Sequence, residues 1–155
     1  AIIPFLMEKE NMDAMQIDNF LNRRSGILGI SGLSSDFRDL EAAANNGDER
    51  SQLAIDVFAY KVQKYIGSYV AAMGGVDAIV FTAGLGENSP FMREKICNGL
   101  EYLGTRIDPE LNKIRGKARE ISIKRARTKI FVIPTNEELV IARDTKRICR
   151  RIIDL

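Results

Sequence analysis

The fold is decided by a stretch in the middle of the chain, VDAIVFTAGLGENSP, at residues 76–90. Residues 76–82 are nearly continuous in apolar side chains, which is typical of a buried parallel strand. Glycines follow at positions 84 and 86, and Pro90 suits the first position of a helix. The stretch therefore predicts a strand, a glycine-containing loop and a helix over residues 90–103.

The same plan recurs near the end of the chain, in KIFVIPTNEE at residues 129–138. Residues 129–133 predict a second strand, and a last helix follows Pro134 and Thr135. Earlier segments predict helices: two short ones within residues 2–24, one that begins near Asp36, and a long one from the turn at 45–48 to Tyr69. An aromatic stripe on this long helix is expected to pack in the core. This order of elements predicts an α/β fold with a short parallel sheet flanked by helices.

Length and composition limit the classes of protein that fit. The chain has 155 residues, 45% of them hydrophobic. This is enough for one sizeable core but short for two ordinary domains, so residues 1–155 are predicted to form a single unit. The net charge of +2 gives no reason to expect a nucleic-acid or membrane partner. Residues 113–129 carry eight Lys or Arg and one acid, but no interleaved aromatic residue, so a solvated basic face is favoured over nucleic-acid binding.

The residue types that are missing narrow the chemistry further. The sequence contains no His, which excludes Ser–His and Cys–His nucleophiles, and its two cysteines do not form a zinc pattern. Free buried thiols in a reducing cytoplasm are expected for Cys97 and Cys149. The chain opens on AIIPF, without a signal-peptide pattern, and is expected to be a piece of a longer cytoplasmic protein.

Two predicted strand ends carry polar segments. In open α/β sheets, ligands bind beyond the carboxyl ends of the strands. Gly84 and Gly86 are expected to adopt positive φ and to let the backbone approach an anion or a nucleotide closely. A tight strand-to-helix turn is the alternative, because the third glycine of GxGxxG and a following Gly-Lys-Ser/Thr are both missing.

The second segment contains two neighbouring acids. Thr135 and Glu138 have the spacing of a capping box, which leaves Glu137 without an evident local role. A carboxylate at the sheet edge is a suitable ligand for Mg²⁺. A favourable charge in the first helical turn is the alternative, and spacing alone does not decide between them.

A third polar segment, SSDFRD, lies at residues 34–39. Asp36 could accept hydrogen bonds from hydroxyls, Phe37 could pack under a flat ring, and Arg38 could pair with a phosphate. The alternative is an ordinary capped helix with an exposed arginine.

Three segments resemble the acetate kinase family, in family order and over essentially the whole chain. They are FTAGLGENS at 81–89, VIPTNEEL at 132–139, and SGILGISG at 25–32 together with SSDFRD at 34–39. The family is similar in fold to actin, Hsp70 and sugar kinases (ribonuclease-H-like), and its members transfer a phosphoryl group between ATP and acetate, giving acetyl phosphate and ADP.

The resemblance implies roles for particular residues. The nucleotide (ATP or ADP) would bind in a pocket with two walls. One wall would consist of Gly84, Leu85, Gly86, Glu87 and Asn88, and the other of Asp36, Phe37 and Arg38. Glu137 would help to hold Mg²⁺.

The resemblance also implies what the chain lacks. The family's catalytic aspartate, histidine and substrate-binding arginines lie before the first residue, so no catalytic residue is expected here and the chain alone is expected to be inactive. The parent would be a cytoplasmic homodimer that uses small-molecule substrates. A propionate or butyrate kinase, or a non-catalytic module for nucleotide binding or dimerisation, remains the alternative.

Overall fold

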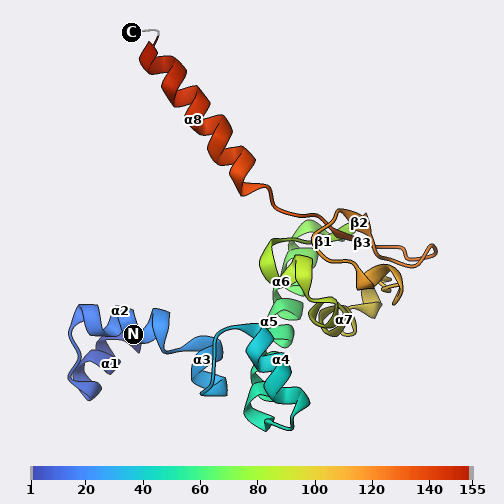
Figure 1. Ribbon diagram of the computed structural model, residues 1–155. Coiled ribbons are helices and arrows are strands. Elements are labelled where there is room, and N and C mark those ends of the chain that lie inside the picture. Colours follow the sequence, from blue (N-terminus) through green and yellow to red (C-terminus); the bar gives the residue numbers. More distant parts are fainter. Residues whose placement is uncertain (1, 154–155) are drawn as a thin grey trace. The chain divides into compact units, whose positions relative to one another are not determined.

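The structure is a computed structural model that describes residues 2–153, with side chains through residue 150 (Figure 1). Its contacts group the chain into two compact units, Ala1–Tyr69 and Val70–Leu155. The length predicted one core, but each unit has buried apolar residues of its own.

The first unit is helical. The two short helices predicted within residues 2–24 are confirmed, and Asp13 and Gln16 form a reciprocal capping box at the start of the second. Ile17, Leu40 and Ile55 supply the largest buried apolar side chains of this unit. Its elements are α1 (Ile2–Glu10), α2 (Ala14–Arg23), α3 (Gly26–Ser31), α4 (Phe37–Asn45) and α5 (Glu49–Met73).

The long predicted helix is α5, and the stripe expected to pack in the core does so only in part. Phe58, Val62 and Ile66 are half-buried, but Tyr65 and Tyr69 are 61% and 63% exposed. The buried face consists of small residues and one isoleucine: Ser51, Ala54, Ile55 and Ala59. Small side chains let a neighbouring element approach the helix closely, which a row of aromatic rings would prevent.

The second unit is built on a three-stranded sheet with the order β1-β3-β2. Strand β1 (Ala78–Phe81) pairs in parallel with β3 (Lys129–Val132), as predicted. Strand β2 (Arg119–Glu120) was not predicted, and it pairs antiparallel with β3. The sheet is therefore mixed rather than wholly parallel, because the short connection from β2 to β3 permits only an antiparallel pair.

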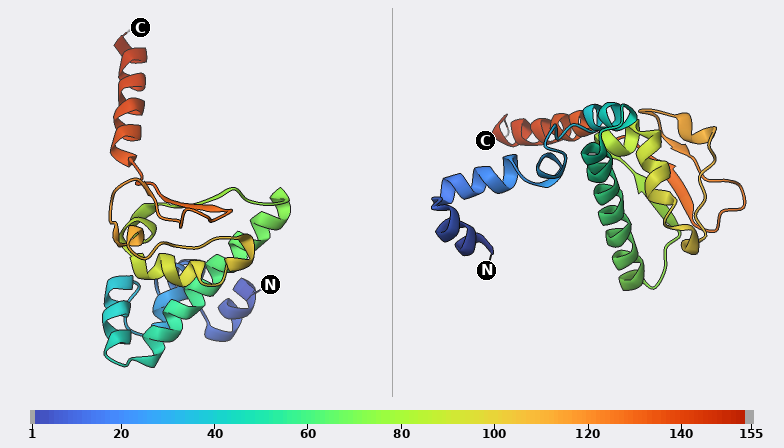
Figure 2. Two further views of the ribbon diagram at one scale, coloured as in Figure 1. Left: turned by 90° about the vertical axis from the view of Figure 1, so that its right-hand side faces the viewer. Right: turned by 90° about the horizontal axis from the view of Figure 1, so that it is seen from below.

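Helices cover this sheet and extend its core. In both views of Figure 2, α7 runs alongside the strands. Met92, Ile96 and Leu100 are buried, as are Ile130 and Val132 of β3. The remaining elements are α6 (Ala83–Asn88), α7 (Pro90–Cys97), the 3₁₀ turns η1 (Glu101–Leu103) and η2 (Leu111–Lys113), and α8 (Glu137–Ile153).

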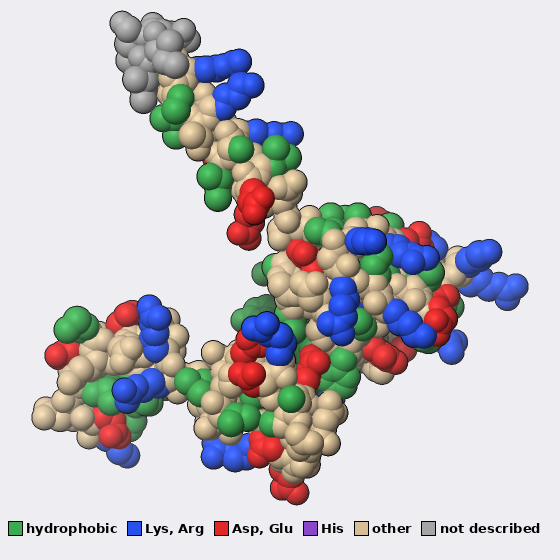
Figure 3. All heavy atoms as spheres, in the orientation of Figure 1, with side chains coloured by type: hydrophobic (Ala, Val, Ile, Leu, Met, Phe, Trp, Pro, Cys, Tyr) green, Lys and Arg blue, Asp and Glu red, His purple; other side chains and the backbone are tan. Residues whose placement is uncertain are grey.

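Helix α8 exposes its described side chains to solvent, including Val140, Ile141 and Ile148. Figure 3 shows Lys and Arg side chains gathered along one side of it. Over the described part of the chain, no helix has the length and apolar character needed to cross a bilayer. Both cysteines are free, as expected, but Cys149 on α8 is exposed and only Cys97 is buried.

Candidate functional site

Two of the predicted polar segments leave the sheet at the same edge. β1 and β3 are parallel neighbours, and Phe81 lies opposite Val132 in their register. The Ile133 amide then donates to the Phe81 carbonyl oxygen at 2.9 Å. Residues 83–88 and 133–137 therefore begin side by side, as the prediction of two parallel strand ends required.

A carboxylate joins these two segments. Glu87 Oε1 accepts hydrogen bonds from the Thr135 amide at 2.8 Å and from Thr135 Oγ1 at 2.9 Å. The bond from the Thr135 amide, followed by that from its hydroxyl, lowers the pKa of Glu87, and the Ala83 amide adds to this effect. Glu87 was expected to line a nucleotide, but its Oε1 atom is engaged with Thr135.

The glycine segment is a short helix, α6, rather than a loop. The residue with positive φ is Ala83, at +59°, and neither Gly84 nor Gly86 adopts positive φ, contrary to expectation. A Cβ atom at Gly86 would lie 3.3 Å from the Phe81 carbonyl carbon, whereas one at Gly84 would meet no atom within 4 Å. Gly86 thus permits close packing on β1, and only Gly84 faces open space.

The far end of α6 is fixed by Arg93, which sequence reasoning missed. Arg93 is fully buried (0% exposed). Its Nη1 donates to the carbonyl oxygens of Gly86 and Glu87 at 2.8 and 3.0 Å. Nε and Nη2 donate to Asn112 at 2.8 and 2.6 Å, and Nη2 also donates to the Ile114 carbonyl at 2.8 Å.

These bonds use all five N–H donors of the Arg93 guanidinium on neutral acceptors. Burial lowers the pKa of Arg93, and the nearby Arg115 adds to the effect. The sequence does contain a sign that Arg93 is buried. Arg93 shares a helical face with the apolar residues Ile96, Cys97 and Leu100, at spacings of three, four and seven. A cation on an apolar face must find acceptors inside the protein.

The start of α8 differs from the predicted capping box. Asn136 Oδ1 accepts from the Leu139 amide at 3.0 Å, so Asn136 supplies the cap and Thr135 binds Glu87 instead. Glu137 and Glu138 are both exposed in the first turn. The capping argument that separated Glu137 from Glu138 is therefore lost, and the resemblance alone distinguishes them.

Few side chains in the described part of the chain lie close enough together to bind a metal ion. Among the described residues, no group of three or more Asp, Glu, His or Cys side chains could hold a metal ion. A single exposed carboxylate such as that of Glu137 fits Mg²⁺, which keeps several waters and takes one or two protein carboxylates.

The third segment lies in the first unit. Asp36 caps α4: its Oδ1 accepts from the Arg38 amide at 2.9 Å and from Arg38 Nε at 3.0 Å. The side-chain bond from Arg38, followed by the backbone bond, lowers the pKa of Asp36 to about 2. Phe37 packs edge-on against Phe58, with ring centroids 4.6 Å apart. The capped helix with an exposed arginine, the alternative for this segment, is the geometry observed.

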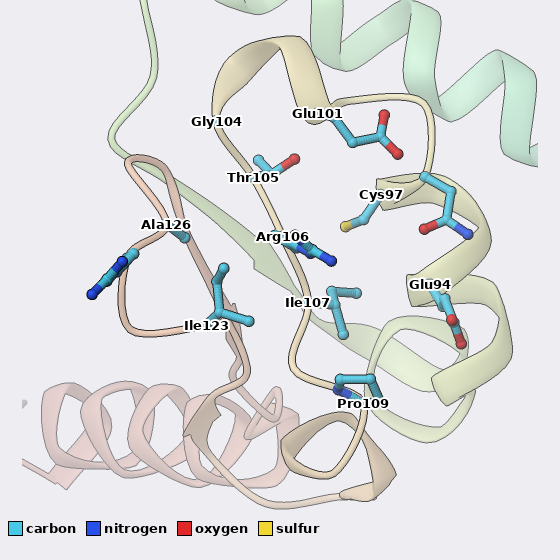
Figure 4. Close-up of a pocket in the computed structure, with 12 residues that line it drawn as sticks. Glu94, Cys97, Glu101, Gly104, Thr105, Arg106, Ile107, Pro109, Ile123 and Ala126 are labelled. Carbon is cyan, nitrogen blue, oxygen red and sulfur yellow. The ribbon is translucent and has the colours of Figure 1, made fainter.

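A cavity of about 660 Å³ lies elsewhere in the second unit (Figure 4). Its buried lining includes Cys97, Thr105 and Ala126, and Glu94 and Arg106 are among its exposed charges. Burial raises the pKa of Cys97 to about 12. None of the predicted site residues lines this cavity.

Comparisons with known proteins place this geometry in context. The sequence model of a family described as the acetokinase family matches residues 1–143. The acetate kinase of Heliobacterium modesticaldum is 61% identical over 150 residues, covering 97% of this chain and 38% of that protein. That of Halothermothrix orenii is 60% identical over 148 residues, covering 96% and 37%. The chain thus spans 37–38% of the length of these curated relatives.

Solved structures agree with the sequence comparison. The crystal structure of Porphyromonas gingivalis acetate kinase matches with a TM-score of 0.86 and 46% identity, covering 96% of this chain and 37% of that one. A propionate kinase from Francisella tularensis matches with a TM-score of 0.80 and 38% identity, covering 91% and 36%.

Proposed function

Because the chain belongs to the acetokinase family and has part of the actin/Hsp70/sugar-kinase fold, we propose that residues 1–155 are the nucleotide-side, C-terminal portion of an acetate kinase. The whole enzyme would use Mg²⁺ and transfer a phosphoryl group between ATP and acetate, giving acetyl phosphate and ADP. The observation that supports this most is the shared sheet edge, where residues 83–88 and 133–137 begin side by side.

The site combines three groups of residues. In this proposal, Gly84, Leu85, Gly86 and Asn88 contact the adenosine, Glu87 shapes the same segment through its bonds with Thr135, and Asp36, Phe37 and Arg38 form a second wall. Gly84 leaves open space where a side chain would stand, which favours close approach of a flat ligand. Glu137 would hold Mg²⁺, which neutralises charge on the transferred phosphoryl group.

The chain itself supplies positioning rather than the reacting groups. Phosphoryl transfer depends on cationic donors around the moving group, and in this proposal the resemblance assigns those donors to a part of the parent enzyme outside residues 1–155. Residues 1–155 alone should therefore give no turnover. A hydroxamate assay for acetyl phosphate should give the blank rate for the isolated chain, and turnover above the blank would contradict the assignment.

Calorimetry provides the binding test. ADP with Mg²⁺ should release heat on titration into the parent-length enzyme, and Gly84→Val should weaken this binding because the side chain enters the open space. Ala72→Val is the control, since it adds bulk at an exposed position of helix α5 without a left-handed backbone. Equal binding by wild type and Gly84→Val would place the nucleotide elsewhere.

A propionate kinase is the second candidate, because a solved propionate kinase shares this part of the fold at 38% identity. Comparison of kcat/KM for acetate and propionate in the parent-length enzyme separates the two. We further propose a cytoplasmic homodimer, which sedimentation would test. A dimer that binds no ADP would favour the non-catalytic module.

A further inference from the structure

The Glu87 carboxylate lies where two strand-end segments meet. One of its oxygen atoms, Oε1, accepts both donors of Thr135, at 2.8 Å from the amide and 2.9 Å from the hydroxyl. Helix α6, which carries Glu87, follows β1, and Thr135 follows β3. The Glu87 side chain therefore joins α6 to the segment that leads into α8.

We propose that Glu87 is a positioning residue that, together with Thr135, sets the place of Glu137 relative to helix α6. The inference rests on the proposed function, because it assigns Glu137 to Mg²⁺. Thr135 precedes Glu137 by two residues, so anchoring its backbone amide fixes the segment that carries the metal ligand. Asn136, between them, caps α8 and continues the same ordered backbone.

Helix α6 does not depend on this contact for its own shape. Arg93 holds the carbonyl groups of Gly86 and Glu87, and Asn88 Nδ2 donates to the Gly84 carbonyl at 2.9 Å. Loss of the Glu87 carboxylate should therefore loosen residues 133–137 more than residues 84–88. The effect on function should fall on the metal-dependent part of nucleotide binding.

The test measures ADP affinity of the parent-length enzyme with and without Mg²⁺. In Glu87→Ala, Mg²⁺-free affinity should stay within about twofold of wild type, while the gain in affinity from Mg²⁺ should fall about tenfold, the effect of one or two lost hydrogen bonds. Glu87→Gln should retain most of the gain, because both donors of Thr135 use one oxygen and the amide oxygen can accept them. Thr135→Ser should retain it as well.

Other outcomes would overturn the inference. If Glu87 touched the nucleotide directly, Glu87→Ala would weaken Mg²⁺-free binding as strongly as Mg²⁺-dependent binding. If Glu87 were a metal ligand, Glu87→Gln would lose the gain as fully as Glu87→Ala. An unchanged gain in Glu87→Ala would show that the contact positions nothing.

A second readout separates this inference from the proposed function. Amide hydrogen exchange of residues 133–137 should quicken in Glu87→Ala and not in Glu87→Gln, whether or not ADP binds. If the wild-type enzyme binds no ADP, the proposed function fails, and exchange alone decides the positioning role. Unchanged exchange at these residues would refute that role.

Discussion

Arg93 and Asn112 are joined twice, by Nε donating to Asn112 Oδ1 at 2.8 Å and by Nη2 donating to the Asn112 carbonyl oxygen at 2.6 Å. Asn112 Nδ2 in turn donates to the Pro90 carbonyl at 2.9 Å. Asn112 in η2 is thus bonded both to the buried guanidinium and to Pro90 at the start of α7. The same guanidinium reaches the C-terminal carbonyls of α6, so one side chain organises three elements.

Substitution of Arg93 should be among the most damaging single changes to this chain. Arg93→Ala leaves several buried carbonyl acceptors unpaired, each costing about 1–3 kcal/mol, so we expect a loss of at least ~3 kcal/mol in the free energy of unfolding. Arg93→Lys should lose less, because an ammonium keeps three donors. Urea unfolding measures both, with the exposed Arg106→Ala as control. A loss for Arg93→Ala no greater than for Arg106→Ala would contradict the network's role.

The left-handed backbone of Ala83 predicts a stabilising substitution. At φ +59°, Ala83→Gly removes a steric cost of about 1–2 kcal/mol, offset in part by the greater entropy of glycine in the unfolded chain. Gly86→Ala should destabilise instead, because its Cβ would lie 3.3 Å from the Phe81 carbonyl carbon. Thermal unfolding of the two variants should therefore shift in opposite directions, and shifts of the same sign would show that local space does not govern this segment.

The two acids at the start of α8 should differ in function although they resemble each other in exposure. Glu137→Gln should raise the Mg²⁺ concentration needed for half-maximal activity of the parent-length enzyme by about tenfold, as expected for loss of one carboxylate ligand. Glu138→Gln is the matched control and should leave this concentration unchanged. A reversed order would assign the metal to Glu138.

Asp36 should titrate at unusually low pH. Its folded-state pKa of about 2 lies below the ordinary value because Arg38 donates to the carboxylate. A lowered folded pKa adds stability above the unfolded pKa of about 3.9, and this contribution is lost as the pH falls toward 2. Carboxyl-carbon chemical shifts should give a midpoint near 2, and Arg38→Met should raise it. A midpoint that Arg38→Met leaves unchanged would remove Arg38 as the cause.

The two thiols should react at very different rates. Cys97 is 3% exposed and has a pKa raised to about 12, so little thiolate is available at neutral pH. Cys149 is exposed on α8. Iodoacetamide followed by peptide mass analysis should label Cys149 in the native chain and both cysteines in urea. Early labelling of Cys97 would mean that α7 opens readily.

Local patterns predicted much of this structure. Asp36 caps the helix whose start was predicted near it, and β1 and β3 lie where their apolar runs placed them. Such features depend on residues within a few positions of each other. The two strand-end segments met at one edge because parallel pairing requires it.

The predictions failed where a residue far away in the sequence forms the hydrogen bond, or where a neighbouring residue takes the predicted role. Thr135 matched a capping box, but Asn136 supplied the cap, and Thr135 bound a carboxylate 48 residues away. Arg93 finds its acceptors around residue 112, which helical spacing does not reveal. The positive φ fell on Ala83 rather than on a glycine, so residue type alone did not locate it.

The order of the sheet places β1 at its border, bonded to another strand on one side only within the described chain. Its backbone on the other side is a template on which a further strand can assemble. In a concentrated solution of residues 1–155, the same edge can pair between two copies of the chain, so dilute, cold storage suits such a preparation.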